Sequence, residues 1–182
     1  MIKPLAAILL LLSTSAFAAP TPAPAALAPL LASIQQRLAV ADQVALSKWD
    51  SGKAVEDRPR EHDVIVGATI MANNFKVPAE LVEPFFSAQI EANKLVQYAR
   101  LAEWHLQGKA PDSPRPDLAG EIRPKLDELQ KALLKELADF APYRQQALCP
   151  VWLAAANRQA TQDPLRYLAL TRATAPLCGA KA

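Results

Sequence analysis

The sequence predicts an all-α fold: a single-domain bundle of about six helices, in which the first and third helices are long. The 182 residues are 51% hydrophobic, and most of the apolar residues are Ala and Leu, which favour helices. No segment alternates apolar and polar residues in the manner of a strand. Only five residues are Gly against 16 Pro, which disfavours tight hairpins and glycine-rich phosphate loops. The net charge of +2 argues against a protein that coats nucleic acid.

The N-terminus has the pattern of an export signal. A positive start at Lys3 precedes the apolar run Leu5–Leu12, and Ala16-Phe17-Ala18 supplies the small residues that a signal peptidase requires. The sequence therefore predicts a signal peptide (1–18), a Pro/Ala-rich disordered leader (19–24), and one helical domain (25–182) exported to the periplasm or the medium. A retained N-terminal anchor is the alternative, although the apolar run is shorter than the roughly 20 residues that span a bilayer.

Prolines and glycines divide the domain into segments. Three helices (29–50, 57–74 and 79–107) are expected to form the core part of the domain (25–108), and three more (124–140, 143–159 and 165–175) its C-terminal part (109–182). Gly52 ends the first helix, and Asp57 is the expected N-cap of the second. Pro84 predicts a late start or a kink in the third helix. Ile70, Tyr98 and Leu106 belong to the apolar pattern of the second and third helices, and we expect residues 108–116 to form a connecting loop.

The two cysteines, Cys149 and Cys178, lie in the C-terminal third. An even number of cysteines in an exported chain is typical of a disulfide, and a turn at Asp163-Pro164 would bring the two together on antiparallel helices. Metal binding is the competing interpretation. It is disfavoured because His62 and His105 are distant in sequence and no C-x-x-C motif is present.

Arg37 and Lys48 are candidate anion-binding residues of the first helix. They are eleven residues apart, which at 100° per residue places both on one face of the helix, about 16 Å apart along its axis. Two long cationic side chains so placed would close on a small anion between them. A solvated basic edge is the alternative.

Two further polar clusters stand at helical spacing. The second helix begins with the cluster Asp57, Arg60 and Glu61. The cluster is either a helix cap with an i,i+3 ion pair, or the polar mouth of a binding site in which the arginine binds a carboxylate through paired hydrogen bonds. Asn93 and Gln97 lie one turn apart in the middle of the third helix, either facing inward or as part of a surface stripe.

Together these clusters resemble the all-helical, AroQ-type chorismate mutases. The resemblance rests on the spacing of Arg, Lys, acid and Arg in RLAVADQVALSKWDSGKAVEDRPRE (37–61), followed by Asn93 and Gln97. The export signal, the cysteine pair and the segments VADQVALSKW and VQYARLAEW resemble the secreted, gamma subclass of that family. The resemblance covers about 30–108 most closely.

This resemblance implies an isomerase that rearranges chorismate to prephenate in a pericyclic step, with no metal, cofactor or nucleophile. It implies that Arg37 binds a carboxylate, that Lys48 bridges a carboxylate and the ether oxygen, and that Arg60 adds to the cationic wall. By the same resemblance Asp57 and Glu61 meet the ring hydroxyl, and Gln97 donates to the ether oxygen beside Asn93.

The arginine for the second substrate carboxylate is the least determined position. The family draws it from the helix after the Pro-rich loop, where Arg123 is the candidate. If Arg123 is instead an exposed first-turn residue, Lys125 or Arg115 would take its place.

Two other functions stay open at the level of sequence. One is an isochorismate pyruvate-lyase on the same scaffold, and the other is a non-catalytic exported helical module that binds a partner protein. The resemblance further implies a homodimer with a complete site in each subunit, acting on chorismate and binding neither nucleic acid nor, after signal cleavage, a membrane.

Overall fold

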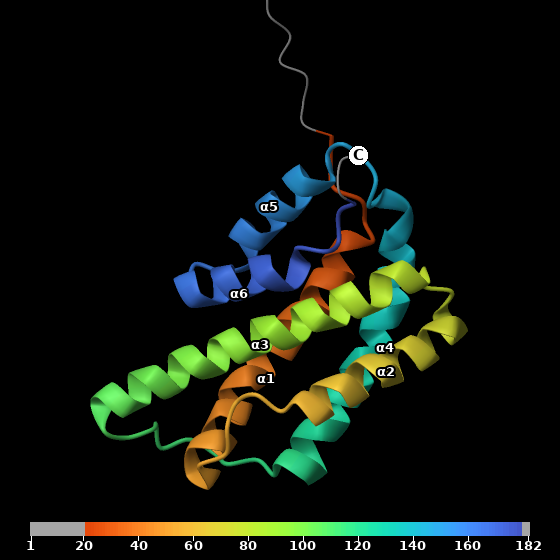
Figure 1. Ribbon diagram of the computed structural model, residues 1–182. Coiled ribbons are helices and arrows are strands. Elements are labelled where there is room, and N and C mark those ends of the chain that lie inside the picture. The colour runs from red at the N-terminus through yellow and green to blue at the C-terminus, as the bar shows by residue number, and fades with distance from the viewer. Residues whose placement is uncertain (1–20, 180–182) are drawn as a thin grey trace, which may run out of the picture.

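The computed structural model describes residues 21–179, which form a helical bundle (Figure 1). The helices are α1 (Leu27–Ser51), α2 (Arg58–Phe75), α3 (Ala79–Gln107), α4 (Arg123–Phe140), α5 (Cys149–Ala160) and α6 (Pro164–Thr174). A π-helical turn, η1 (Leu118–Ile122), precedes α4, and a 3₁₀ turn, η2 (Ala141–Tyr143), follows it. Residues 21–179 contain no strand, so the predicted all-α class is confirmed. None of the helices in this range has the length and apolarity needed to cross a membrane.

Local chemistry explains where the first three helices begin and end. Gly52 and Gly108, with φ of 64° and 70°, adopt the left-handed conformation that terminates α1 and α3. The Asp57 side chain accepts a hydrogen bond from the backbone N–H of Arg60, as expected of an N-cap. Pro84 does not delay α3, which begins at Ala79, so the predicted late start is wrong.

Helices α1 and α3 pack against each other through the centre of the molecule (Figure 1). Helix α2 contacts α3 and α4, and α4 contacts α1, so these four helices surround a common interior. Its core contains the fully buried side chains Ile34, Phe85, Phe86 and Leu133. Burial of each such side chain contributes about 1.5 to 3 kcal/mol, which supplies much of the driving force for folding.

The C-terminal hairpin of α5 and α6 packs on the opposite side of α3 from α2 (Figure 1). Gln89 of α3 donates a buried hydrogen bond to the carbonyl oxygen of Ala173 at 2.9 Å. Asn157 of α5 donates to the Thr174 hydroxyl, also at 2.9 Å, and so ties α5 to α6. Arg166 of α6 reaches α1, where it pairs with Asp42. These polar contacts fix the hairpin on the four-helix core.

The fifth helix begins six residues later than the sequence pattern predicts. It starts at Cys149 rather than at 143, because Pro150 lacks an N–H and fits only the first turn of a helix. Asp163 caps α6 at the predicted turn, so the two helices run antiparallel and bring Cys149 and Cys178 together in a disulfide. The predicted disulfide is therefore confirmed.

Three residues of the apolar helical pattern are exposed to solvent. Ile70, Tyr98 and Leu106 expose 69%, 52% and 91% of their surface. Their helices are covered on only part of their circumference, and helical periodicity alone does not show how wide that covered part is.

The predicted signal peptide, 1–18, lies outside the described residues. Of the predicted leader, residues 21–24 are described, and the Trp152 indole N–H donates to the carbonyl oxygen of Thr21 at 3.0 Å. This short stretch therefore lies against α5, whereas the sequence predicts a disordered leader.

We expect the Cys149→Ala, Cys178→Ala double variant to lose about 3 to 4 kcal/mol of unfolding free energy, because the disulfide closes a long loop in the unfolded chain. Thermal denaturation and urea titration, each with and without reductant, would measure this loss. No residue of α5 or α6 lines the cavity described below, so the kcat of the folded double variant should match that of the parent. A selective loss of kcat at a temperature where the variant is folded would contradict this separation of stability from activity.

Candidate active site

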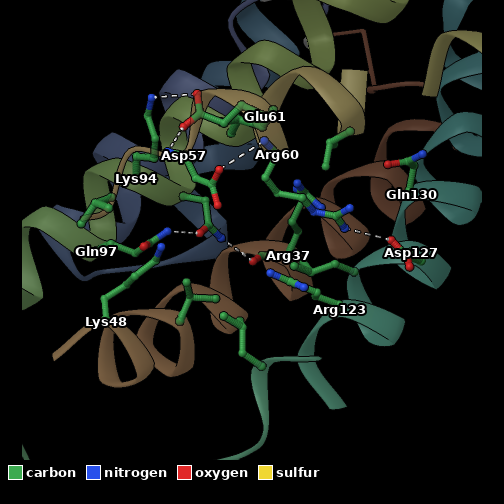
Figure 2. Close-up of a pocket in the computed structure, with 17 residues that line it drawn as sticks. Arg37, Lys48, Asp57, Arg60, Glu61, Lys94, Gln97, Arg123, Asp127 and Gln130 are labelled. Atoms are coloured by element: carbon green, nitrogen blue, oxygen red, sulfur yellow. Dashed lines mark hydrogen bonds and ion pairs between the residues drawn. The ribbon is translucent and has the colours of Figure 1, made fainter. Parts of the chain in front are cut away.

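A cavity of about 140 Å³ lies among α1, α2, α3, α4 and η1 (Figure 2). The lining residues are Arg37, Val44, Lys48, Val55, Asp57, Arg60, Glu61, Val64, Ile90, Asn93, Lys94, Gln97, Leu118, Arg123, Leu126, Asp127 and Gln130. Five of these side chains are basic and three are acidic, an excess of two positive charges. The apolar ones give the cavity walls that exclude water and strengthen electrostatic interactions inside it.

Arg37 is the deepest charge of the cavity. Only 6% of the surface of Arg37 is exposed, and its Nε has no hydrogen-bond partner within the described part of the chain. Burial, together with repulsion from Arg60, lowers the pKa of Arg37 to about 10, although Asp127 acts in the opposite sense. The guanidinium is still protonated at neutral pH, so it presents a poorly solvated positive charge that favours an anionic ligand.

Lys48 and Gln97 lie together on one side of the cavity (Figure 2). Gln97 is buried, and its Nε2 donates to Oδ1 of Asn93 at 2.7 Å. Asn93 in turn donates from Nδ2 to the carbonyl oxygen of Arg37 at 3.1 Å, which links α3 to α1. The amides therefore face inward, and their alternative interpretation as a surface stripe is wrong. An ammonium and a neutral amide therefore line this side of the cavity.

Asp57 and Glu61, which both line the cavity, cap the start of α2 with reciprocal hydrogen bonds. Asp57 accepts from the N–H of Arg60, and Oε1 of Glu61 accepts from the N–H of Asp57 at 3.1 Å. The other oxygen of Glu61 accepts from Lys94 at 3.1 Å, and Glu91 also pairs with Lys94. Burial by itself would lower the pKa of Lys94, but these two carboxylates outweigh burial and the net shift is upward.

Arg60 and Arg123 lie with Arg37 on the side opposite Lys48 (Figure 2). The Arg60 guanidinium does not pair with Asp57, as the sequence alternative of an ion pair would require. It turns instead to Asp127 of α4, with Nη2 at 3.7 Å from Oδ1. Arg123 is the first residue of α4 and follows directly on η1.

The segment before Arg123 is held by Arg115. Its Nε donates to Asp50 at the end of α1 at 2.9 Å, and its Nη1 donates to the carbonyl oxygens of Pro111 and Ser113. The Asp117 side chain then caps η1 by accepting hydrogen bonds from the backbone N–H groups of two η1 residues. The loop is thereby closed onto itself and onto α1, and this sets where η1 and Arg123 lie.

Comparison with known proteins decides which family this geometry belongs to. The model of the family "Chorismate mutase type II" matches residues 28–98. The secreted chorismate mutase of Mycolicibacterium smegmatis is 36% identical over 156 residues, covering 84% of this chain and 86% of that protein. The secreted chorismate mutase of Mycobacterium tuberculosis is 31% identical over 159 residues, covering 85% and 79%. The chain belongs to the chorismate mutase family.

A solved structure extends the match to the fold. The crystal structure of chorismate mutase from Burkholderia phymatum superposes with a TM-score of 0.81 and 47% identity, covering 85% of this chain and 96% of that one. The similarity therefore includes the C-terminal helices, beyond the segment that the family model matches.

All eight binding candidates named from the sequence line this one cavity of the chorismate mutase fold: Arg37, Lys48, Asp57, Arg60, Glu61, Asn93, Gln97 and Arg123. Lys125 and Arg115, the substitutes considered for Arg123, do not line it. The structure adds Lys94, Asp127 and Gln130, whose place in the cavity depends on how α2, α3 and α4 pack. The i,i+4 spacing of Arg123 and Asp127 is the one sequence signal that would have pointed to Asp127.

We expect Arg115→Ala to raise the KM for chorismate several-fold without unfolding the protein, because the loop that positions η1 and Arg123 loses its link to Asp50. Asp50→Ala and the double variant complete a double-mutant cycle, and the two single effects should not add. Arg158→Ala, which removes an exposed arginine on α5 far from the loop, is the matched control. An unchanged KM in Arg115→Ala, or full additivity in the cycle, would contradict this positioning role.

Proposed function

We propose that this protein converts chorismate to prephenate as an exported isomerase, with the residues of the cavity holding the substrate in a reactive chair conformation. The observation that carries this proposal is the two-sided distribution of charge in the cavity. Lys48 and Gln97 lie on one side and three arginines on the other (Figure 2). The excess of two positive charges matches a small dianion.

Lys48 and Gln97 act on the bond that breaks. As the ether bond lengthens, negative charge develops on its oxygen, and donors already in place stabilise this charge without reorganisation. Lys48 supplies an ammonium that bridges this oxygen and one carboxylate. Gln97 has a second N–H beside the one that it donates to Asn93, and this N–H serves the same oxygen.

Arg37, Arg60 and Arg123 bind the carboxylates at the other end of the substrate. Guanidinium groups form paired hydrogen bonds with a carboxylate, which fixes its orientation as well as its position. Arg37 is rigid because it is buried, whereas Arg60 and Arg123 are more exposed and adapt to the ligand. Asp57 and Glu61, at the start of α2, accept hydrogen bonds from the ring hydroxyl.

The reaction is a pericyclic rearrangement, so the residues need to transfer no proton and form no covalent bond. Catalysis then consists of holding the substrate in a compact conformation and stabilising developing charge. Even a modest enzymatic acceleration of about 10⁶-fold requires about 8 kcal/mol of preference for the transition state. Fixed cations in a cavity with apolar walls supply such a preference because their interactions are poorly screened.

Export agrees with the names of the curated relatives, which are secreted chorismate mutases. An oxidising compartment also suits the disulfide between Cys149 and Cys178. The homodimer implied by the family resemblance stays a prediction.

The proposed activity is tested by incubating the purified protein separately with chorismate and isochorismate and identifying prephenate or pyruvate. We expect prephenate from chorismate. Lys48→Ala should lose about 10²- to 10³-fold in kcat/KM, because a donor to the developing charge is removed. Lys125→Ala removes a lysine that does not line the cavity and is the matched control. Pyruvate from isochorismate as the main product, or an unaffected Lys48→Ala variant, would contradict the proposal.

Gln97 makes a second, independent prediction about pH. An amide donates at any pH, so kcat should persist at neutral pH and above. In Gln97→Glu, burial would raise the pKa of the new carboxyl group, which donates only when protonated, and activity should then decline as pH rises. Profiles of kcat from about pH 5 to 7.5 compare the parent with the variant. A steep loss in the parent over this range would exclude Gln97 from this role.

A further inference from the structure

Asp127 is an acidic side chain in a cavity whose arginines are suited to bind an anion. It lies on α4 one turn after Arg123, so both side chains project from the same face of the helix toward the cavity. The Asp127 carboxylate is partly exposed, at 62% for its side chain, so it remains accessible to water and to ligands. Its negative charge opposes the binding of a dianion and therefore requires an explanation.

The other two acids of the cavity have structural partners. Asp57 caps α2, and Glu61 accepts from the N–H of Asp57 and from Lys94. Within the described residues, Asp127 has only one partner, the Arg60 guanidinium at 3.7 Å. This contact is longer than a hydrogen bond, so Asp127 acts on Arg60 through charge more than through fixed geometry.

The arginines on this side of the cavity repel one another when no ligand is bound. Burial lowers the pKa of Arg37, the charge of Arg60 lowers it further, and the charge of Asp127 raises it. Asp127 therefore offsets the repulsion between Arg37 and Arg60 in the empty site. A bound carboxylate would offset the same repulsion, so the ligand and Asp127 perform the same electrostatic task.

We propose that Asp127 is an internal counter-ion that balances the arginine cluster of the empty site and competes with the substrate's carboxylate for Arg60. The inference rests on the proposed function, since it assigns Asp127 to the same cavity. Competition of this kind weakens the binding of substrate and product alike, because both are dianions. Asp127 thereby limits product retention at the cost of a higher KM.

The counter-ion role predicts a separation of KM from kcat. The carboxylate at this end keeps its charge throughout the rearrangement, so Asp127 opposes the ground state and the transition state equally. A group that acts equally on both changes KM and leaves kcat unchanged. A residue that serves only to position Arg60 would show the opposite sign, since its removal would loosen Arg60 and raise KM.

The test is Asp127→Asn, which removes the charge and keeps the shape. We expect the KM for chorismate and the dissociation constant for prephenate each to fall about three- to tenfold, with kcat unchanged, and the difference from the parent to shrink as salt is added. Asp127→Glu, which keeps the negative charge, should leave the KM for chorismate and the dissociation constant for prephenate at the parent's values. Glu128→Gln is the matched control, because it removes the same charge from the neighbouring residue, which does not line the cavity and pairs with Lys131.

Titration calorimetry with prephenate separates the two hypotheses. A parent that binds prephenate but does not turn over chorismate would contradict the proposed function alone. Equal or weaker prephenate binding by Asp127→Asn, an equal gain in Glu128→Gln, or a gain that does not depend on salt would overturn the counter-ion role. Failure of Asp127→Asn to fold would overturn it as well, because an exposed counter-ion is not required for folding.

Discussion

The charge of Arg37, buried between helices, is the constraint on which the rest of the site depends. A buried cation is costly unless other groups compensate for its lost hydration. Here the second guanidinium, that of Arg60, increases the cost, and the charge of Asp127 offsets it only in part. The burial of apolar side chains in the core of the molecule offsets this cost. The empty site is thus less favourable than the liganded one, which is a source of anion affinity.

Rigid helices hold the side chains of the cavity in fixed positions relative to one another. Most side chains that line the cavity project from α1, α2, α3 and α4, and the link from Gln97 through Asn93 to the backbone of α1 fixes two of these helices relative to each other. Sites built on packed helices hold their groups more closely in place than sites built on loops. Arg123 is the arginine of the cavity that follows an irregular segment, and the hydrogen bonds of Arg115 hold the preceding loop in place. Positioning is the main requirement of a reaction that involves no covalent catalysis.

The C-terminal hairpin supports the site without entering it. The disulfide joins the two ends of the hairpin, the hydrogen bond from Gln89 ties the hairpin to α3, and the ion pair of Arg166 with Asp42 ties it to α1. The first four helices thus line the cavity, and the last two contribute stability without lining it. Such reinforcement is useful to an exported protein, which must persist in an oxidising environment.

The sequence by itself determined the features that depend on neighbouring residues. Helix ends at Gly52, Asp57 and Gly108 follow from backbone conformation and capping, and the spacing of Arg37 and Lys48 follows from the helical repeat, so these were predictable. The start of the fifth helix was mispredicted although Pro150 carried the local signal for it. Helical periodicity alone did not indicate which polar residues would line a common cavity; the family resemblance did.

Only the tertiary structure decided which side chains share the cavity from different helices. Lys94, Asp127 and Gln130 look like ordinary surface positions in the sequence, because their surroundings depend on how α2, α3 and α4 pack. The exposure of Ile70 and Tyr98 was decided in the same way, since periodicity defines an apolar face but not which neighbour covers it. The physical reason is that short-range order follows from the chain's own geometry, whereas the charge balance of a cavity is a sum over segments far apart in the sequence.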